Sequence, residues 1–289
     1  MIVDSRLVAK LTIAAALLVL VSPAQHAFTQ TTRDALSPVI STAAAPPGTE
    51  TLDVEWVKIT RLGVDVMLAA VARPQGAGPF PVVLLLHGSH GFAQEYVRLA
   101  RDLSGGGFLA VAACWFQGGG GAGSRFVTSI PCSDGPARPD ATSPEAMRIV
   151  EALLQAVRTL PGARPDRVAL FGHSRGGGAT VNYVLQGGTV QAAIVNSAGY
   201  PKQFAQLSPR LQTPIMMLHG TADSPADGGS PLTNVQMARD FESALRAAGK
   251  PVEVVYYDGS GHNAIFTDPG QHRDEVQRMR AFLQRHLRD

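Results

Sequence analysis

The stretch RVALFGHSRGGGAT, from Arg167 to Thr180, places one serine, Ser174, between Gly172 and Gly176. The apolar run before the serine is typical of a buried strand, and the run after it is compatible with a helix. A Gly-x-Ser-x-Gly pattern between a strand and a helix is typical of a strained turn that raises the serine hydroxyl above the end of a sheet. The stretch therefore predicts an exposed nucleophile. The alternative is a glycine-rich turn with a structural role only.

The segments around this turn alternate between strands and helices. Two runs with period-two alternation, 51–60 and 64–72, predict an antiparallel hairpin near the N-terminus. Ser143 followed by Pro144 is favourable chemistry for a helix start. Strands alternating with helices predict a mostly parallel, twisted sheet with helices on both faces. The expected strands are 81–88, 108–114, 167–172, 191–197, 214–220 and 252–258, and the expected helices are 92–107, 143–160, 176–186, 232–249 and 273–287.

A serine nucleophile needs a base, and in this architecture the acid and then the histidine follow the serine along the chain. His262 lies downstream in a loop after the last strand, so it is the expected base; the alternative is a surface histidine. Asp223, four residues beyond His219 at a strand end, is the favoured acid, with Asp227 as the alternative. Asp258 is expected to cap its own turn.

An acyl-transfer site also needs two N–H groups that stabilise an oxyanion. One expected donor is the amide of Arg175, directly after the nucleophile. The other is the amide of Ser89 in the loop HGSHGF, with that of His90 as the alternative. His87 and His90 have the spacing of a metal pair, but no nearby carboxylate or cysteine completes a ligand set. The sequence therefore predicts neither a metal nor a cofactor.

The N-terminus reads as a targeting segment. Residues 1–24 combine basic side chains, a short apolar run and small residues before the end, which is the pattern of a secretory signal peptide. The predicted location is secreted or periplasmic, without stable membrane insertion after cleavage, and an uncleaved membrane anchor is the alternative. Residues 25–50, rich in Ser, Thr, Ala and Pro, predict a linker, and residues 51–289 predict the folded domain.

The composition fits one globular domain with a small ligand. Of 289 residues, 45% are hydrophobic, and the formal net charge is +2. Nothing in this balance of charges indicates a nucleic-acid partner. The oligomeric state does not follow from the sequence. Cys114 and Cys132 are the two cysteines; a disulfide between them is the working hypothesis for an exported protein, and two free thiols are the alternative.

A long Gly/Pro-rich segment, residues 115–142, separates one expected strand from the next helix. Loops of this length are uncommon and often functional. We interpret it as a flap over the site with Trp115 and Phe116 at its base, and these two residues with His90 are the hypothetical substrate contacts. The alternative is a disordered surface insertion. The segment 198–213 is too short to hold a large lid domain.

Residues 52–288 resemble the α/β-hydrolase fold, and within it the dienelactone hydrolase family. The stretches that carry the resemblance are RPQGAGPFPVVLLLHGSHG (73–91), DRVALFGHSRGG (166–177), TPIMMLHGTAD (213–223) and VEVVYYDGSGHNAIF (252–266). The resemblance implies hydrolysis of esters or lactones without a cofactor. Dienelactone hydrolases proper have cysteine where this chain has Ser174, which favours an esterase-like member.

We therefore expect a carboxylic ester hydrolase that acts on a small-molecule ester through Ser174, His262 and Asp223 and forms an acyl-enzyme. One alternative is a serine peptidase similar to the prolyl oligopeptidases, although only about 50 residues precede the core here, too few for a propeller domain. The other is a non-catalytic binding protein on a hydrolase fold. Such a protein would be expected to lack one of the three residues, and all three are present.

Overall fold

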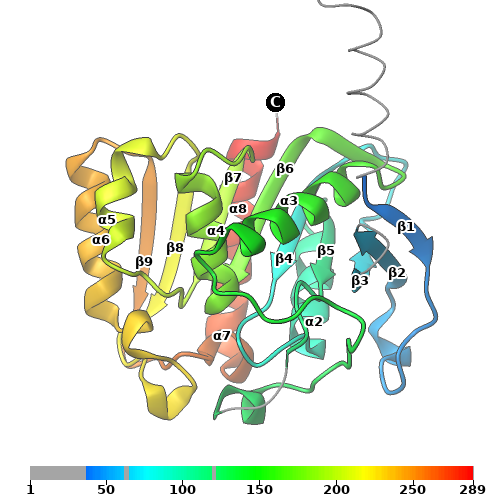
Figure 1. The fold of residues 1–289 in the computed structure, drawn as a ribbon, viewed down its shortest axis with the longest axis horizontal. Helices are drawn as coiled ribbons and strands as arrows, with labels where there is room; N and C mark the ends of the chain where they lie inside the picture. The colour runs from blue at the N-terminus through cyan, green and yellow to red at the C-terminus, as the bar shows by residue number, and fades with distance from the viewer. Residues whose placement is uncertain (1–36, 62–64, 119–121, 289) are drawn as a thin grey trace, which may run out of the picture. The chain divides into compact units, whose positions relative to one another are not determined.

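The computed structural model describes residues 37–61, 65–118 and 122–288, which form one nine-stranded sheet flanked by helices (Figure 1). The strand order is β1-β2-β3-β5-β4-β6-β7-β8-β9. The first three strands pair antiparallel, and β3 also runs antiparallel to β5. The six strands β4 to β9 are parallel to one another. The strands are β1 (Val39–Thr42), β2 (Glu55–Arg61), β3 (Asp65–Ala72), β4 (Phe80–Leu86), β5 (Leu109–Ala113), β6 (Ala163–His173), β7 (Ala192–Asn196), β8 (Ile215–Gly220) and β9 (Val252–Tyr257).

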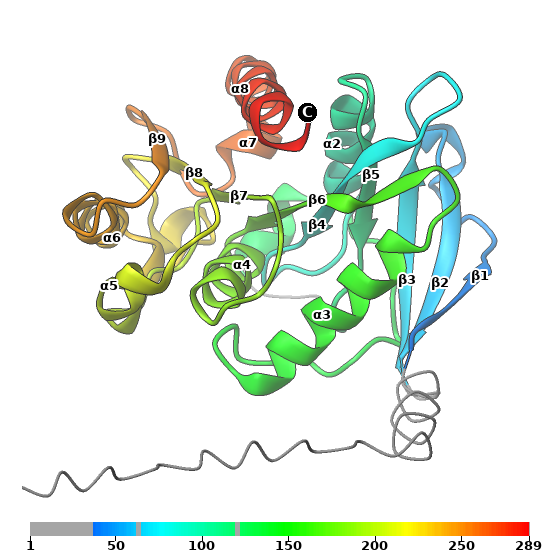
Figure 2. The same ribbon diagram turned by 90° about the horizontal axis from the view of Figure 1, so that it is seen from above.

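Helices cover both faces of this sheet, as the alternating pattern predicts. Seen from above, α2 and α8 lie on one face, and α3, α4, α5 and α6 lie on the other (Figure 2). Each layer encloses its own apolar core against the sheet. The helices are α2 (Gln94–Ser104), α3 (Pro144–Arg158), α4 (Arg175–Leu185), α5 (Gln203–Leu207), α6 (Val235–Ala247), α7 (Ala264–Thr267) and α8 (Pro269–Leu287).

Local chemistry explains where these elements begin. The Ser143 hydroxyl accepts from the Ala146 amide at 3.1 Å, with Pro144 in the first turn, so the expected start of α3 is confirmed. The last helix begins four residues before the expected position 273, because the Asp268 carboxylate accepts from the amides of Gly270 and Gln271. Asp-Pro is itself a helix-start signal that the sequence interpretation did not use.

Part of the expected linker, 25–50, is structured: residues 39–42 form a strand, and residues 25–36 lie outside the described residues. The compact unit begins at Ser37, and β1 adds to the sheet edge by pairing with β2, with Val39 opposite Thr60. The β-branched run VIST can pair in this way despite its polar surroundings. The expected signal peptide, residues 1–24, lies outside the described residues. Within the described ranges, no helix is long and apolar enough to cross a membrane.

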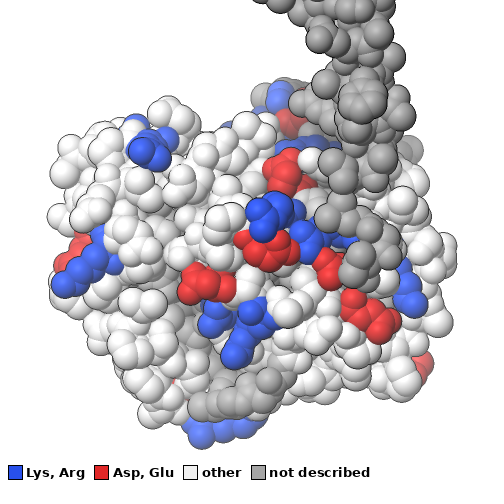
Figure 3. Space-filling model, in the orientation of Figure 1, with Lys and Arg blue, Asp and Glu red and all other residues white. Residues whose placement is uncertain are grey.

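The face shown in Figure 3 carries acidic and basic side chains beside one another rather than one block of like charge. Ion pairs account for part of this arrangement. Glu145 on α3 pairs with Arg61 at the end of β2 and with Arg148 one turn along the helix. The pair with Arg61 ties α3 to the antiparallel part of the sheet, whereas the pair with Arg148 lies within the helix.

The parallel strands bring four loops to one edge of the sheet. Ligand sites in such sheets lie at the carboxyl ends of the strands. In this chain the loops after β4, β6, β8 and β9 leave from that edge, and neighbouring strands end nearly level: Leu86 is opposite Gly172, and Gly220 is opposite Tyr257. The expected nucleophile, acid and histidine are on the last three of these loops.

Candidate active site

Ser174 lies on a strained turn between β6 and α4. Its backbone has φ 53° and ψ −115°, a conformation that residues other than glycine rarely adopt. The flanking glycines are sterically required: a Cβ at Gly172 would lie 2.2 Å from the Gly176 carbonyl oxygen, and one at Gly176 would lie 2.3 Å from the Leu86 carbonyl oxygen. The Ser174 amide donates to the Asn196 carbonyl at 3.0 Å, which ties the turn to β7.

His262 reaches Ser174 from the loop after β9. Its Nε2 lies 2.9 Å from the Ser174 Oγ, although 88 positions separate the two residues in the sequence. Both groups are largely withdrawn from solvent, with 1% of His262 and 8% of Ser174 exposed. The structure therefore places the expected base within hydrogen-bonding distance of the expected nucleophile.

Asp223 completes a chain of hydrogen bonds. Its Oδ2 lies 2.7 Å from the His262 Nδ1, and its Oδ1 accepts from the Thr233 hydroxyl at 2.8 Å. A carboxylate only accepts, so the hydrogen of a neutral His262 ring is on Nδ1 and the Nε2 lone pair faces Ser174. The alternative acid, Asp227, instead accepts from the Ser224 hydroxyl. Asp258 accepts at 3.1 Å from the hydroxyl of Thr221, which follows the neighbouring strand β8, so this partner lies outside the turn that Asp258 was expected to cap.

The loop that carries the acid is held by buried polar contacts. The His219 Nε2 lies 2.7 Å from the Thr233 carbonyl, so this nitrogen donates. Burial lowers the pKa of His219, which keeps the ring neutral. Gly229 closes the loop against the acid, because a Cβ there would lie 2.3 Å from the Asp223 Oδ1. Thr233 and Gly229 were not singled out from the sequence; the capping pattern Ser230-Pro231-Leu232-Thr233 was the available signal.

The loop between β4 and α2 approaches Ser174 from the other side. A Cβ at Gly88 would lie 3.0 Å from the Ser174 Cβ. The Gly88 amide donates to the Tyr96 hydroxyl at 2.8 Å, and the Trp115 indole donates to the His87 carbonyl at 2.8 Å. These bonds fix the two residues that precede Ser89, whose amide is an expected oxyanion donor.

A cavity of about 360 Å³ opens beside the nucleophile. Ser89, Ser174 and Arg175 line its floor, and the segments 140–142, 199–204 and 228–233 contribute to its walls. The walls mix polar groups such as Thr142 with apolar side chains, among them Phe204 and Leu232. Leu232 is 46% exposed in this lining, where its side chain is open to a bound molecule.

Comparison with known proteins identifies the family of this chain. Residues 67–286 match the family model described as "Dienelactone hydrolase family". The chain belongs to the dienelactone hydrolase family. A relative from Escherichia coli K12, named provisionally as a carboxymethylenebutenolidase, is 28% identical over 246 residues, which cover 79% of this chain and 83% of the relative.

Solved structures share the fold of this dienelactone hydrolase family member. A Klebsiella pneumoniae protein, titled provisionally as a dienelactone hydrolase, aligns with TM-score 0.60 and 22% identity over 85% of this chain and 98% of that one. A Pyrococcus furiosus esterase aligns with TM-score 0.64 and 15% identity over 87% and 99%. The expected fold, a mostly parallel sheet with helices on both faces and an antiparallel N-terminal hairpin, is confirmed.

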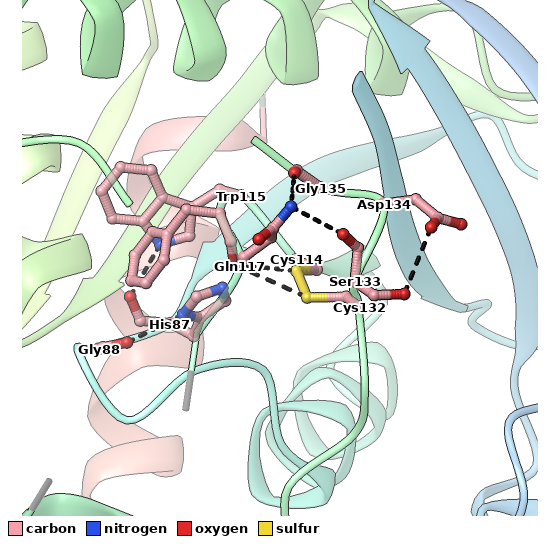
Figure 4. Close-up of a disulfide and its surroundings, with 10 residues drawn as sticks. His87, Gly88, Cys114, Trp115, Gln117, Cys132, Ser133, Asp134 and Gly135 are labelled. Atoms are coloured by element: carbon pink, nitrogen blue, oxygen red, sulfur yellow. Dashed lines mark hydrogen bonds between the residues drawn. A yellow bond between two sulfur atoms is a disulfide. The ribbon is translucent and has the colours of Figure 1, made fainter. Parts of the chain in front are cut away.

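The structure does not bring three hypothetical substrate contacts to the cavity of this family member. Trp115 and Phe116 are fully buried and pack against the His87 ring below the loop, as Figure 4 shows for Trp115. His90 is 4% exposed, and its Nε2 lies 2.7 Å from the Tyr96 hydroxyl. Position at a strand end predicted proximity to the site, but the apolar rings are better buried under the loop than exposed in the cavity.

Several imidazoles near the nucleophile are neutral because they are buried. Burial lowers the pKa of His87 to about 3 and that of His90 to about 4. Burial, followed by the charges of His262 and His90, also lowers the pKa of His173 well below its usual value. The His87 Nδ1 lies 2.9 Å from the Gly88 carbonyl and the His90 Nε2 lies 2.7 Å from the Tyr96 hydroxyl, so both rings help to hold the loop.

Cys114 and Cys132 are bonded to each other in the structure and join the end of β5 to the 115–142 segment (Figure 4). Next to the disulfide, the Gln117 side chain donates to the Ser133 and Gly135 carbonyls, each at 2.7 Å. The described parts of the segment are thus anchored, and residues 140–142 at its end line the cavity. Only this end, and not the aromatic base, lies at the expected flap position.

A buried polar chain lies behind the nucleophile and was missed by sequence reasoning. The Asn196 side chain lies 2.8 Å from the His173 Nδ1 and donates to the Glu275 carboxyl at 2.7 Å. Gln271 donates to the other Glu275 oxygen at 2.7 Å. Burial raises the pKa of Glu275 to about 8. A glutamate in an amphipathic helix gave no sequence signal that it would turn inward.

Proposed function

We propose that this chain is a serine hydrolase that cleaves carboxylic esters, lactones included, through Ser174, His262 and Asp223. One observation carries the proposal: the Ser174 hydroxyl, the His262 ring and the Asp223 carboxylate form an unbroken hydrogen-bonded chain of 2.9 and 2.7 Å. Membership of the dienelactone hydrolase family supports the reaction class. The names of the Escherichia coli relative and the Pyrococcus furiosus esterase support a lactone or ester as the substrate.

In the first half-reaction the Ser174 Oγ attacks the ester carbonyl while the His262 Nε2 takes the hydroxyl proton. The tetrahedral oxyanion accepts hydrogen bonds from the Arg175 and Ser89 amides, and each such donor is worth about 2.7–4 kcal/mol of barrier lowering. His262 then gives its proton to the leaving alkoxide as the carbon–oxygen bond breaks. The products of this step are an alcohol and an acyl-Ser174.

In the second half-reaction water replaces the alcohol. His262 takes one proton from water, the hydroxide attacks the acyl carbonyl, and the same two amides hold the oxyanion. The bond to Ser174 breaks and His262 returns its proton to the Oγ, which releases the carboxylic acid. Asp223 accepts from the His262 Nδ1 and stabilises the imidazolium that forms twice in the cycle.

The cavity sets the expected substrate class. Its volume of about 360 Å³ and its mixture of apolar and polar walls suit a small ester rather than a long extended chain. The apolar side chains Ala141, Phe204 and Leu232 would contact the acyl or alcohol group. No cofactor takes part in the proposed reaction.

The proposal predicts that Ser174→Ala removes turnover. Wild type should hydrolyse short acyl nitrophenyl esters and bind a fluorophosphonate covalently, whereas Ser174→Ala should lose roughly 10⁴-fold or more in kcat and resist labelling. Ser208→Ala is the matched control, since Ser208 is also buried but donates to the Ala244 carbonyl on α6 and is not part of the cavity lining. Its kcat should stay within about twofold of wild type.

Two outcomes contradict the proposal. Ester turnover that survives in Ser174→Ala would place the chemistry elsewhere, and a wild-type protein that neither turns over esters nor reacts with the fluorophosphonate would be a binding protein. A higher kcat/KM for peptide amides than for the matching esters would favour the serine-peptidase alternative.

A further inference from the structure

The Arg175 side chain connects three parts of the site. Its backbone amide follows the nucleophile, and its guanidinium turns toward the β4–α2 loop. The Nε donates to the Ser89 hydroxyl at 3.0 Å, and the Nη1 donates to the Pro139 carbonyl at 2.8 Å. One residue thereby joins the nucleophile turn, the loop of the second expected oxyanion donor and the end of the 115–142 segment.

The hydrogen bond from Arg175 anchors Ser89, the next residue of the β4–α2 loop after His87 and Gly88. His87 and Gly88 are anchored by the Trp115 indole and the Tyr96 hydroxyl. Within the described ranges, the bond to Arg175 is the one hydrogen bond that the Ser89 side chain makes. Arg175 therefore holds Ser89, whose amide is the second expected oxyanion donor, from the side of the cavity.

The environment of the guanidinium strengthens this contact. Arg175 is partly buried in the cavity floor, and desolvation together with the nearby Arg138 lowers its pKa, while Asp140 acts in the opposite direction. The group nevertheless remains charged at neutral pH. A charged donor makes a shorter and stronger hydrogen bond than a neutral one, and two donors on one planar fork fix the direction of both acceptors.

We propose that the Arg175 side chain is a positioning residue for the oxyanion hole: it orients Ser89 so that the Ser89 and Arg175 amides converge on the same oxygen. The inference rests on the proposed function. The side chain acts through Ser89 and does not touch the reacting atoms, so its removal should weaken the transition state and leave ground-state binding of a neutral ester almost unchanged.

Three variants test the proposal on a neutral, short acyl nitrophenyl ester. Arg175→Met keeps the length of the side chain and removes both donors, and Ser89→Ala removes the acceptor and keeps the amide. Each should lower kcat about ten- to a hundredfold with KM within about twofold, less than the full loss of an oxyanion donor. The double variant should be no slower than the slower single variant, because both changes break one contact.

The opposite results overturn the proposal. An Arg175→Met enzyme with wild-type kcat does so, as does a loss that falls on KM alone, which would make Arg175 a substrate contact. Losses that multiply in the double variant do so as well. Should Arg175→Met fail to fold, as judged by its thermal transition, Ser89→Ala decides alone: an unchanged kcat refutes the role.

The Ser174→Ala variant separates this proposal from the one on which it rests. If Ser174→Ala is inactive and both Arg175→Met and Ser89→Ala match wild type, only the positioning role fails. If Ser174→Ala retains ester turnover, the proposed function itself fails. A boronic acid that forms a tetrahedral adduct gives an independent readout: its Kd should rise in Arg175→Met by the same factor as kcat falls, whereas the KM of the ester should not.

Discussion

At the scale of single residues, the acid of the candidate site is held on both of its oxygens. Asp223 faces His262 with Oδ2, and its Oδ1 accepts from the Thr233 hydroxyl. The same hydroxyl accepts from the Ser230 amide at 2.8 Å, so Thr233 ties the acid to the turn that ends its loop. Asp223 is only 4% exposed, and a lost donor could not be replaced by bulk water without opening the loop.

Thr233→Val should therefore reduce both activity and stability. Valine has nearly the same shape but leaves the Asp223 Oδ1 without its donor, which should cost about 1–3 kcal/mol of unfolding free energy. A misdirected acid should also lower kcat about tenfold or more, since His262 then loses its orientation. Urea unfolding and steady-state kinetics measure the two effects.

Thr233→Ser is the control for this change because it keeps the hydroxyl. It should retain most of the kcat and lose only the stability contributed by one methyl group, about 1 kcal/mol. If Thr233→Val and Thr233→Ser behave alike, the hydroxyl has no part in holding the acid.

Residues that follow a fixed chain order were accessible from the sequence, and residues that depend on side-chain direction were not. The order serine, acid, histidine singled out Ser174, Asp223 and His262, and the structure brings these three together. Trp115 was placed near the site by its position after a strand. Which way its ring turns depends on packing against His87, and a linear pattern does not contain that information.

At the scale of elements, the first turn of helix α4 contains three consecutive glycines, Gly176 to Gly178, that differ in the space around them. A Cβ at Gly176 would lie 2.3 Å from the Leu86 carbonyl oxygen, and one at Gly177 would lie 2.6 Å from the Ala198 Cβ. A Cβ at Gly178 would meet the Ala141 Cβ at 3.4 Å, which is an ordinary contact. The helix can therefore accept a methyl group at the third position only, and that position faces the cavity.

Gly178→Ala should stabilise the protein and narrow the cavity. Alanine is favoured over glycine in a helix by up to about 1 kcal/mol, and here it meets no clash. The added methyl group should lower kcat/KM for bulky acyl groups more than for acetyl, because it reduces the space between α4 and Ala141. Thermal unfolding and a profile of ester chain lengths measure these effects.

Gly177→Ala provides the comparison within the same helix. It adds the same methyl group with the same helix propensity, but the contact of 2.6 Å with Ala198 requires a shift of the backbone. We expect it to be less stable than wild type by about 1–3 kcal/mol. Equal effects of the two substitutions would show that the close approach to Ala198 is not a constraint.

Elements with strong periodicity or capping were predictable, and elements that depend on tertiary pairing were not. Helix α3 follows from its cap and amphipathic pattern, and β4 follows from a continuous apolar run. The edge strand β1 has four residues with an exposed pattern, so only its partner β2 identifies it. Short pieces such as α5 are similarly set by packing against α6 rather than by their own sequence.

At the scale of the whole molecule, four neutral histidines lie buried around the candidate site. His87, His90, His173 and His219 are all at most 4% exposed, and burial is the first cause of the lowered pKa of each. In the unfolded chain the same rings take up a proton near pH 6.5. Below about pH 6.5 the folded protein therefore binds fewer protons at these rings than the unfolded chain does.

The unfolding free energy should fall as the pH drops below about 6.5, because the unfolded state then binds protons that the folded state does not. For His87, with a folded pKa of about 3, the stability is fully present above pH 6.5 and is lost progressively as the pH falls toward 3. One such group removes about 2 kcal/mol between pH 7.5 and pH 5. His272 acts in the opposite direction, since its hydrogen bond with Asp102 raises its pKa.

The variant His87→Phe isolates the contribution of His87, because a phenyl ring suits the aromatic pocket. Urea unfolding measures the unfolding free energy at pH 7.5 and at pH 5. The loss of unfolding free energy between these two pH values should be about 2 kcal/mol smaller in His87→Phe than in wild type. An identical pH dependence in the two proteins would mean that His87 is protonated in the folded state or is not buried.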